Sequence, residues 1–221
     1  MSDFIDIFSS SDPSSISTSV RLIILLTILS IAPGMLILMT SFTRIIVVLS
    51  FVRTSLATQQ MPPNQVLIGL ALFLTFFIMA PTFSEVYDGA LQPLFEEEIT
   101  LDEAYESASI PLKEFMAKHT RQKDLSLFLS YTDTAQPETI QDIPLTALIP
   151  AFAISELKTA FQMGFMIFIP FLIIDMAVAS VLMSMGMMML PPVMISLPFK
   201  ILLFVLVDGW YLIIHSVLQG Y

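Results

Sequence analysis

The sequence has 221 residues, of which 56% are hydrophobic and 13% are charged, and its mean hydropathy is +0.84. A soluble domain carries roughly 25% charged residues, so this composition excludes an ordinary water-soluble globule, a disordered tail and a collagen-like fibre. The net charge of −10 argues against attraction to the phosphates of a nucleic acid. Because the chain has no cysteine, disulfides, thiolate zinc sites and cysteine nucleophiles are also excluded. What remains is typical of an all-α membrane protein with several hydrophobic segments.

The distribution of charge divides the chain into four segments. Residues 1–19 form a polar lead that we expect to be exposed. They lack the basic and apolar regions of a signal peptide, so we expect that any targeting segment has been removed or that the first apolar helix replaces it. Residues 20–80 and 145–221 are apolar, and each is expected to form a hydrophobic helical hairpin. Between them, residues 81–144 hold 13 acidic and 4 basic side chains, a net charge of −9.

The first apolar segment contains two helical runs separated by a proline pair. No charged residue occurs over residues 22–43, which is 22 positions and enough to cross a hydrocarbon core of about 30 Å. Pro33 lies inside this run and is expected to kink it. The sequence MPPN at residues 61–64 predicts a turn, after which a second apolar run covers residues 66–80.

The second apolar segment follows the same plan with more charges. Residues 145–190 are too many for one straight span, so a short entry helix and a bend near Pro150 or Pro170 are expected. A turn at the next Pro-Pro pair leads into a last apolar run over residues 193–217. Charged side chains interrupt these runs at Glu156, Lys158, Asp175, Lys200 and Asp208.

Basic residues beside the apolar runs indicate the orientation in the membrane. Arg44 and Arg53 precede the first turn, and no acidic residue lies near them, so this side is expected to face the cytoplasm. The acidic segment and both termini would then lie outside the cytoplasm, although Arg21 argues mildly against this orientation. Within the acidic segment, the apolar spacing predicts two or three short amphipathic helices, interrupted at Pro111.

Charged side chains inside apolar helices are the first functional candidates. Inserting one into a membrane costs about 2.5–3.5 kcal/mol, so such groups are usually paired or line a cavity. Asp175, Lys200 and Asp208 lie inside apolar runs, and Glu156 lies just before one. Ion pairs within the chain, ion pairs between copies of the chain, and a proton or ion relay all fit this pattern.

A cluster of methionines is the second candidate, since seven of the fifteen fall within residues 176–194. Methionine is unbranched and polarizable, and it adapts to irregular partners. Met187, Met188 and Met189 cannot all face one side of a helix, because successive residues rotate by about 100°. Before the proline pair they are expected to form a loop, whose soft tips could close a pore if several copies formed a ring. A core or lipid-facing helix is the alternative.

No motif of an enzyme is found. Asp175 and Asp208 could form an aspartyl dyad, but Asp208 lacks the Gly-x-Gly-Asp context of intramembrane proteases. Motifs of the types G-x-S-x-G and H-E-x-x-H and a phosphate-binding loop are absent, and His119 and His215 are too far apart in sequence to suggest a metal site. We therefore expect no catalytic residue, no metal and no cofactor.

Long, ordered motifs extend over residues 22–217. They read MPPNQV at 61–66, GLALFLT at 69–75, PAFAISELKTAFQMGF at 150–165, IPFLIID at 169–175, GMMM at 186–189, PFK at 198–200 and VDGW at 207–210. Together they resemble the FliP family, the flagellar members of the type III secretion export gate, which are related to the injectisome SctR family. The acidic segment is less similar to the family. Family members usually carry a cleavable signal sequence, so the chain resembles a mature or trimmed form.

The resemblance implies a fold and a function. Kinked helical hairpins, with four main hydrophobic segments, would pack side by side with further copies of the chain and with FliQ and FliR. The resulting helical ring would lie in the flagellar basal body at the bacterial inner membrane, with the acidic segment and the termini on the periplasmic side. Unfolded flagellar subunits would pass through the ring, in a machine that also contains FlhA and FlhB.

The resemblance also implies roles for individual residues. In the family the methionine run forms a gasket that narrows the channel, a role that here falls to Met187, Met188 and Met189. Family charges implicated in subunit contacts and export match Glu156, Asp175 and Lys200.

Two other functions fit the composition. A secondary transporter or ion channel for a small solute would need a polar site near the middle of the membrane, yet the one asparagine, Asn64, lies in a turn. An accessory assembly factor without a pore is the other possibility. Hydropathy does not separate helices buried by membrane lipid from helices buried by neighbouring subunits.

Overall fold

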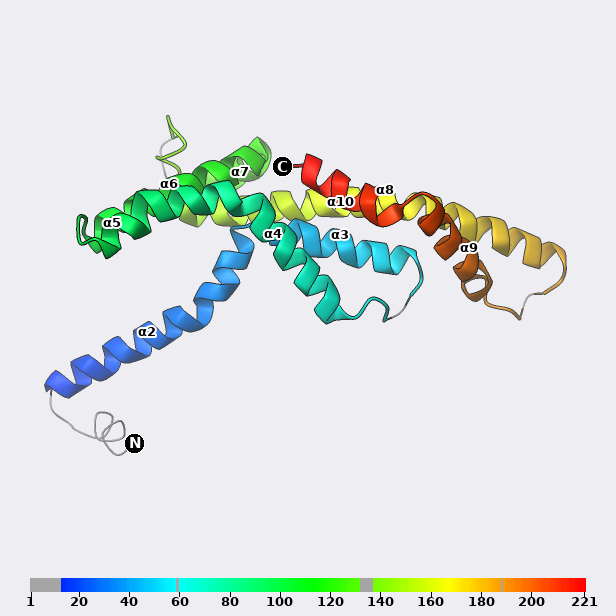
Figure 1. Ribbon diagram of the computed structural model, residues 1–221, viewed down its shortest axis with the longest axis horizontal. Coiled ribbons are helices and arrows are strands. Elements are labelled where there is room, and N and C mark those ends of the chain that lie inside the picture. The colour runs from blue at the N-terminus through cyan, green and yellow to red at the C-terminus, as the bar shows by residue number, and fades with distance from the viewer. Residues whose placement is uncertain (1–12, 59, 132–136, 188) are drawn as a thin grey trace. The chain divides into compact units, whose positions relative to one another are not determined.

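The described part of the chain is helical. The computed structural model describes residues 13–58, 60–131, 137–187 and 189–221, and within these ranges no strand occurs (Figure 1). The all-α prediction is therefore confirmed. Contacts divide the chain into two units, residues 1–38 and 39–221, and each is described by itself.

The first unit contains one described helix, α2 (Pro13–Leu38), with Pro33 inside it. Its 26 residues include many exposed apolar side chains, among them Leu25 and Leu29. Of the predicted polar lead, residues 1–12 lie outside the described residues.

The second unit begins with a helical hairpin formed by α3 (Phe42–Ser55) and α4 (Asn64–Val86). Pro62 and Pro63 lie in its tip, as the sequence predicts. A proline lacks the backbone N–H that a helix interior needs, but it is tolerated just before a helix begins. Pro63 accordingly has extended backbone angles, φ −58° and ψ 152°, and α4 starts at the next residue.

A second hairpin is formed by α8 (Leu145–Ser184) and α9 (Pro192–Leu206), which continues into α10 (Gly209–Gln219) at an angle of 63°. Helix α8 is one continuous helix of 40 residues with Pro150 and Pro170 inside it, so the expected separate entry helix is absent. Each proline removes one backbone hydrogen bond, whereas packing against α3, α7 and α9 supports the helix along its length.

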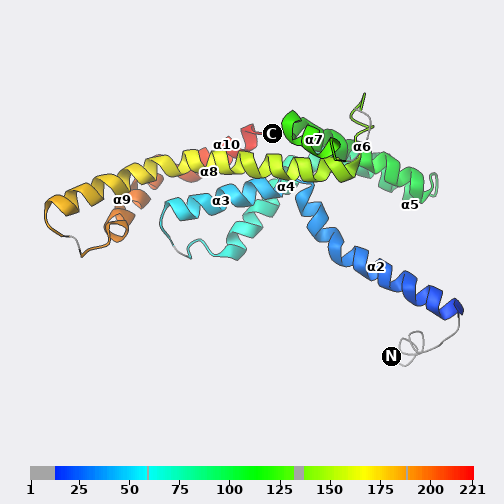
Figure 2. The ribbon, with the colours of Figure 1, turned by 180° about the vertical axis from the view of Figure 1, so that it is seen from behind.

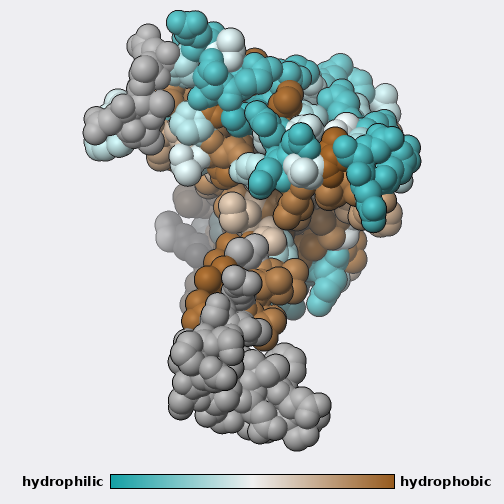
Figure 3. All heavy atoms as spheres, turned by 90° about the vertical axis from the view of Figure 1, so that its left-hand side faces the viewer, coloured by the Kyte–Doolittle hydropathy of each residue, from teal (hydrophilic) through white to brown (hydrophobic). Residues whose placement is uncertain are grey.

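The acidic segment between the hairpins forms short helices. Thr100 and Glu103 make a capping box, in which each backbone N–H is bound by the other residue's side chain. The predicted interruption at Pro111 is wrong, because the third helix runs through it and is held by contacts with α4 and α8. Figure 3 shows hydrophilic side chains gathered over this segment. Its elements are η1 (Tyr87–Leu91, a π-helical turn), α5 (Gln92–Phe95), α6 (Leu101–His119) and α7 (Gln122–Leu129).

The core is organised by helix α3, which packs along α8 in the same chain direction. Arg44 near the start of α3 contacts Glu156, and Phe51 further along contacts Phe161, with ring centroids 5.3 Å apart. Because the two helices run parallel, the tips that follow them point to the same end of the unit (Figures 1 and 2). The buried residues of α3 recur at helical spacing and form one apolar stripe: Ile45, Val48, Leu49 and Val52.

Two helical stretches are long and apolar enough to cross a membrane, Asn64–Phe95 and Leu145–Ser184. The number rises to four if each bent pair of helices counts as one span. In the most apolar window of α8 only 11% of the residues are buried inside the chain. The surface of this helix is therefore apolar and largely uncovered.

The close approach of α3 and α8 generates a testable prediction at Gly164. A Cβ atom there would lie 2.4 Å from the ring of Phe51 and 2.9 Å from its Cβ, which cannot move without moving α3. Gly164→Ala is expected to destabilise the fold by about 1–3 kcal/mol, the usual cost of overpacking. The measurement is the helix-melting midpoint of the purified protein in detergent.

Gly69→Ala is the matched control, because nothing lies within 4 Å of the Cβ position at Gly69 in α4. Alanine has the higher helix propensity, so this variant should be as stable as the parent or slightly more so. Equal melting midpoints for the two variants would contradict the proposed tight contact.

Candidate functional site

A buried ion pair joins the two parallel helices near the start of α3. The guanidinium of Arg44 donates to both carboxylate oxygens of Glu156, through Nε at 2.9 Å and through Nη2. Arg44 is 3% exposed and Glu156 is 0% exposed. An arginine–carboxylate pair with two parallel hydrogen bonds fixes distance and orientation together. This pair therefore sets how α3 lies against α8.

The end of the chain closes over this pair. The hydroxyl of Tyr221 donates to Oε2 of Glu156 at 2.6 Å, and the Arg44 guanidinium lies 3.9 Å from the centre of the Tyr221 ring. Nη1 of Arg44 also donates to the carbonyl of Gly220 at 2.8 Å. Burial and the negative charge of Glu156 raise the pKa of the Tyr221 hydroxyl, so it stays a hydrogen-bond donor. We call Arg44, Glu156 and Tyr221 the junction.

His119 packs against the junction from α6. Its ring lies 5.0 Å from that of Tyr221, centre to centre, and its Nδ1 is 2.8 Å from the carbonyl oxygen of Phe115. Burial lowers the pKa of His119, and the nearby Arg44 acts in the same direction. His119 is therefore neutral at neutral pH.

A second ion pair, between buried Lys200 and half-buried Asp175, lies near the other end of α3. Nζ of Lys200 is 2.6 Å from Oδ2 of Asp175 and 3.1 Å from the backbone oxygen of Ser55. The hydroxyl of Ser196 donates to the other carboxylate oxygen of Asp175 at 2.5 Å. Lys200 is 2% exposed. Lys200 thus links α9 to both α8 and α3.

Three of the four charges form ion pairs within a single copy, which is one of the arrangements that the sequence left open. Glu156, Asp175 and Lys200 are paired within one chain, so a single copy leaves none of them unpaired. Asp208 differs: it is exposed, makes no ion pair within the described residues, and has left-handed backbone angles, φ 51° and ψ 54°, where α9 ends and α10 begins. Aspartate tolerates this conformation better than most residues.

The two arginines of the first hairpin lie in different environments. Arg53 lies near the tip, where Nη1 is 2.5 Å from Oδ1 of Asn64, whereas Arg44 is buried at the opposite end of α3. Sequence position alone groups both with the tip. Of the two, only Arg53 offers a charge to the surroundings of the tip.

The methionine tip follows the end of α8. Gly186 has φ +74°, a left-handed conformation that glycine adopts without penalty, and it turns the chain out of the helix. Met187 is 38% exposed and Met189 is 99% exposed. Met188 lies outside the described residues. No group of three or more histidine, aspartate or glutamate side chains that could hold a metal ion occurs in the described ranges.

Other polar contacts were not expected from the sequence. Ser155 donates to Asp124 at 2.7 Å and accepts from the backbone N–H of Arg121 at 3.0 Å, which attaches α7 to α8. Burial favours the protonated form of Asp124, but hydrogen bonds from Ser155 and Arg121 outweigh it and hold the pKa of this carboxyl below its usual range. Ser155 lies within the motif at residues 150–165, but that motif does not reveal its partner, and Tyr221 lies outside the motifs.

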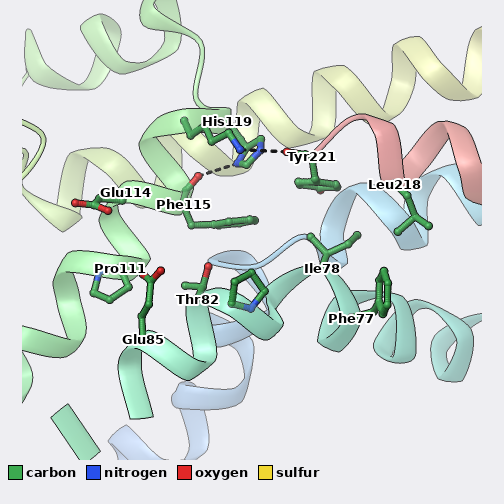
Figure 4. Close-up of a pocket in the computed structure, with 12 residues that line it drawn as sticks. Phe77, Ile78, Thr82, Glu85, Pro111, Glu114, Phe115, His119, Leu218 and Tyr221 are labelled. Atoms are coloured by element: carbon green, nitrogen blue, oxygen red, sulfur yellow. Dashed lines mark hydrogen bonds between the residues drawn. The ribbon is translucent and has the colours of Figure 1, made fainter. Parts of the chain in front are cut away.

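A pocket of about 500 Å³ opens beside the junction (Figure 4). Residues of α4, α6 and α10 and the terminal Tyr221 line it, with the aromatic rings of Phe115 and Tyr221 nearly parallel at 12°. Glu85 and Glu114 line it as well. The pocket thus combines apolar walls with two carboxylates.

The buried junction predicts a large loss of stability when one partner is removed. Arg44→Ala is expected to cost about 3–5 kcal/mol, because Glu156 is left buried and unpaired. Arg53→Ala, on the more exposed side of the same helix, should change stability by only about 0.5 kcal/mol. The two variants are compared by thermal unfolding in detergent.

The double variant Arg44→Met with Glu156→Leu tests the cause of that loss. It removes both charges and should recover most of the stability, since apolar residues of similar size replace the pair. A double variant no more stable than Arg44→Ala would show that the loss is not caused by an uncompensated charge.

The lowered pKa of His119 predicts a pH dependence. Because the folded-state pKa lies below the ordinary value of 6.5, neutral His119 stabilises the fold above that value, and this contribution is lost as the pH falls below it. His119→Gln should therefore flatten the fall of the melting midpoint below pH 6.5. His215→Gln is the control and should keep the parent's profile. Identical profiles for the parent and His119→Gln would exclude this role.

Comparison with known proteins identifies the family. The model of the FliP family matches residues 25–217. The flagellar biosynthetic protein FliP of Bacillus subtilis (strain 168) is 75% identical over 221 residues, which is 100% of both chains. The proteins of the same name from Caulobacter vibrioides and Aquifex aeolicus are 54% and 52% identical, over 91% and 92% of this chain and 76% and 86% of their own. The chain, with its two hairpins and buried charge pairs, belongs to the FliP family.

Proposed function

We propose that this protein is a pore-forming subunit of the flagellar protein export gate, through which unfolded flagellar subunits cross the inner membrane. The relatives are named flagellar biosynthetic proteins, which supports a role in building the flagellum. The observation that carries the proposal is the uncovered apolar surface of the hairpins, together with a methionine tip at their end. Such a surface requires neighbours.

The length of α8 favours protein neighbours along part of that surface. Forty residues at 1.5 Å each make a helix of about 60 Å, about twice the hydrocarbon thickness of a bilayer. A helix of this length aligned with the membrane normal extends well beyond the lipid. The exposed apolar residues on the extending part are then covered by further copies of the chain, in a ring of hairpins packed side by side.

The internal ion pairs support assembly through apolar faces. Since Glu156 and Lys200 are satisfied within one copy, copies can pack without exchanging these charges. Contacts within each subunit offset the free-energy cost of burying these charged groups. The surface of the hairpins that is left for contacts between copies is largely apolar.

The methionine tips would close the channel of such a ring. Met187 and Met189 lie in the short turn between α8 and α9, where Met189 is 99% exposed. Several copies would bring these tips, with Met188 between them, to one level and form a soft apolar constriction. A passing chain would push the flexible side chains aside, and they would close again behind it.

The same proposal gives the location and partners. The ring lies in the inner membrane at the flagellar basal body, with the acidic segment and the termini on the periplasmic side. Lipid surrounds those parts of the helices that lie within the membrane. FliQ and FliR complete the ring, FlhA and FlhB belong to the same export apparatus, and the chain carries out no reaction itself.

A small-solute transporter is the second candidate, and the buried charges argue against it. A transporter needs a polar site near the membrane midplane that a solute can reach. Asp175 and Lys200 are engaged by each other and by Ser196 and Ser55, which leaves little capacity for a solute.

The gasket predicts a leak when the methionines are shortened. Replacing Met187, Met188 and Met189 together by alanine should raise the permeability of the closed gate to small ions, because shorter side chains leave the constriction open. Membrane conductance or ion uptake is measured in cells that still export flagellar subunits.

Met176→Ala is the control, since Met176 is exposed on α8, away from the tip, and should leave permeability unchanged. An unaltered permeability of the triple variant in export-competent cells would overturn the gasket.

A further inference from the structure

Lys158 is an exposed cation on an apolar helix face. Within the described residues no carboxylate forms an ion pair with it, although it is close enough to Asp124 to help lower the pKa of that group. Residues two positions apart on a helix point about 200° away from each other, so Lys158 faces away from Glu156 and the junction. Exposed apolar side chains one turn to either side, Ile154 and Phe161, flank it.

The pocket beside the junction has complementary properties. Glu85 and Glu114 line it, and neither forms an ion pair with another described residue. Glu114 accepts a long hydrogen bond of 3.4 Å from Gln141. The third charged residue of the lining, Lys118, donates to the terminal carbonyl of Tyr221 at 3.2 Å. The net charge of the lining is therefore negative, and its walls are aromatic and aliphatic. Such a pocket fits a cation carried on an apolar stem.

Lys158 points away from the side of α8 that faces the pocket, because Glu156, about 200° from it around the helix, is hydrogen-bonded to Tyr221 of the pocket lining. Figure 1 shows α4, α6 and α10, which line the pocket, in front of α8, and Figure 2 shows α8 in front of them from behind. Lys158 and the pocket lie at the same position along α8, because Glu156, two residues from Lys158, is hydrogen-bonded to Tyr221, which lines the pocket.

We propose that Lys158 of one copy inserts into the pocket of the next copy and pairs there with Glu85 and Glu114. This inference rests on the proposed ring and specifies which two faces meet. Head-to-tail assembly of identical copies requires two different, complementary faces, and a closed ring places equivalent groups of all copies at one height. The lysine and the pocket satisfy both requirements. The apolar side chains beside Lys158 cover the rim of the pocket, including Phe77, which is exposed in a single copy.

Cross-linking between copies tests this contact directly, because the chain contains no cysteine of its own. The double variant Lys158→Cys with Glu114→Cys is treated in membranes with a short bismaleimide. The Cα atoms of a paired lysine and glutamate lie farther apart than a disulfide permits, and the longer reagent spans that separation. A cross-link between copies gives a species heavier than one chain, whereas a cross-link within one copy leaves the mass of a monomer. The expected product is a ladder of cross-linked dimers and higher species, and each single-cysteine variant should give no ladder.

Lys123→Cys with Glu114→Cys is the matched control, since Lys123 is an exposed lysine on α7 outside the proposed contact. It should give no ladder. A ladder of equal strength from this control, or no ladder from the Lys158 pair, would overturn the proposal.

Charge reversal provides a second test. Lys158→Glu alone should dissociate the purified oligomer, because it brings a third negative charge to the pocket. Combining it with Glu85→Lys and Glu114→Lys should restore the oligomer. Failure of the combined variant to reassemble, while each variant retains the parent's helix content, would contradict the pairing.

The mass of the parent protein in mild detergent distinguishes a failure of the proposed interface from a failure of the proposed ring. An oligomeric parent without the Lys158 cross-link leaves the ring standing and refutes this interface. A parent that is monomeric in detergent, together with no cross-linking of the Lys158→Cys and Glu114→Cys double variant in the membrane, refutes the ring itself.

Discussion

The buried pair of Arg44 and Glu156 is the constraint on which the rest of this structure depends. Each charge would be costly to bury alone, so the two helices that carry them have one relative position in which both are satisfied. The carbonyl of Gly220 and the hydroxyl of Tyr221 bind the same pair, which brings the end of α10 to the start of α3. Residues 112 apart in sequence are thereby held in a single cluster.

The second pair, Asp175 with Lys200, complements the first at the other end of α3. Arg44 fixes where α3 begins along α8, and Lys200 binds the carbonyl of its last residue, Ser55. Between the two lies the close contact of Phe51 with Gly164, where only the missing Cβ lets the helices approach. Polar contacts thus fix the register of the two helices, while apolar contacts supply the buried area. The outer faces are left free for neighbouring molecules.

The sequence predicted those features that depend on local chemistry. Pro62 and Pro63 lie in the first tip, and Pro191 lies just before α9, which begins at Pro192, because a proline is tolerated there but not in a helix interior. The net charge of residues 81–144 predicted a polar segment, but α4 continues through Pro81 to Val86. Pro150, Pro170 and Pro111 were misleading, since packing with neighbouring helices compensates for one lost hydrogen bond. The partner of Arg44 was unpredictable, because its identity depends on which helices meet. Tyr221 was missed for the same reason.

The turn at Gly186 has a mechanical consequence. It leaves the methionine side chains with little support of their own, yet it follows Asp175 by only eleven residues, or about 16 Å of helix. The ion pair that anchors Asp175 to Lys200 therefore holds the base of the tip rigidly in place. In this arrangement the methionine side chains are the part that can move, whereas the helices beneath them stay in place. In the proposed ring, a seal built in this way would deform around an object of irregular width and return to its original outline without any rearrangement of the helices.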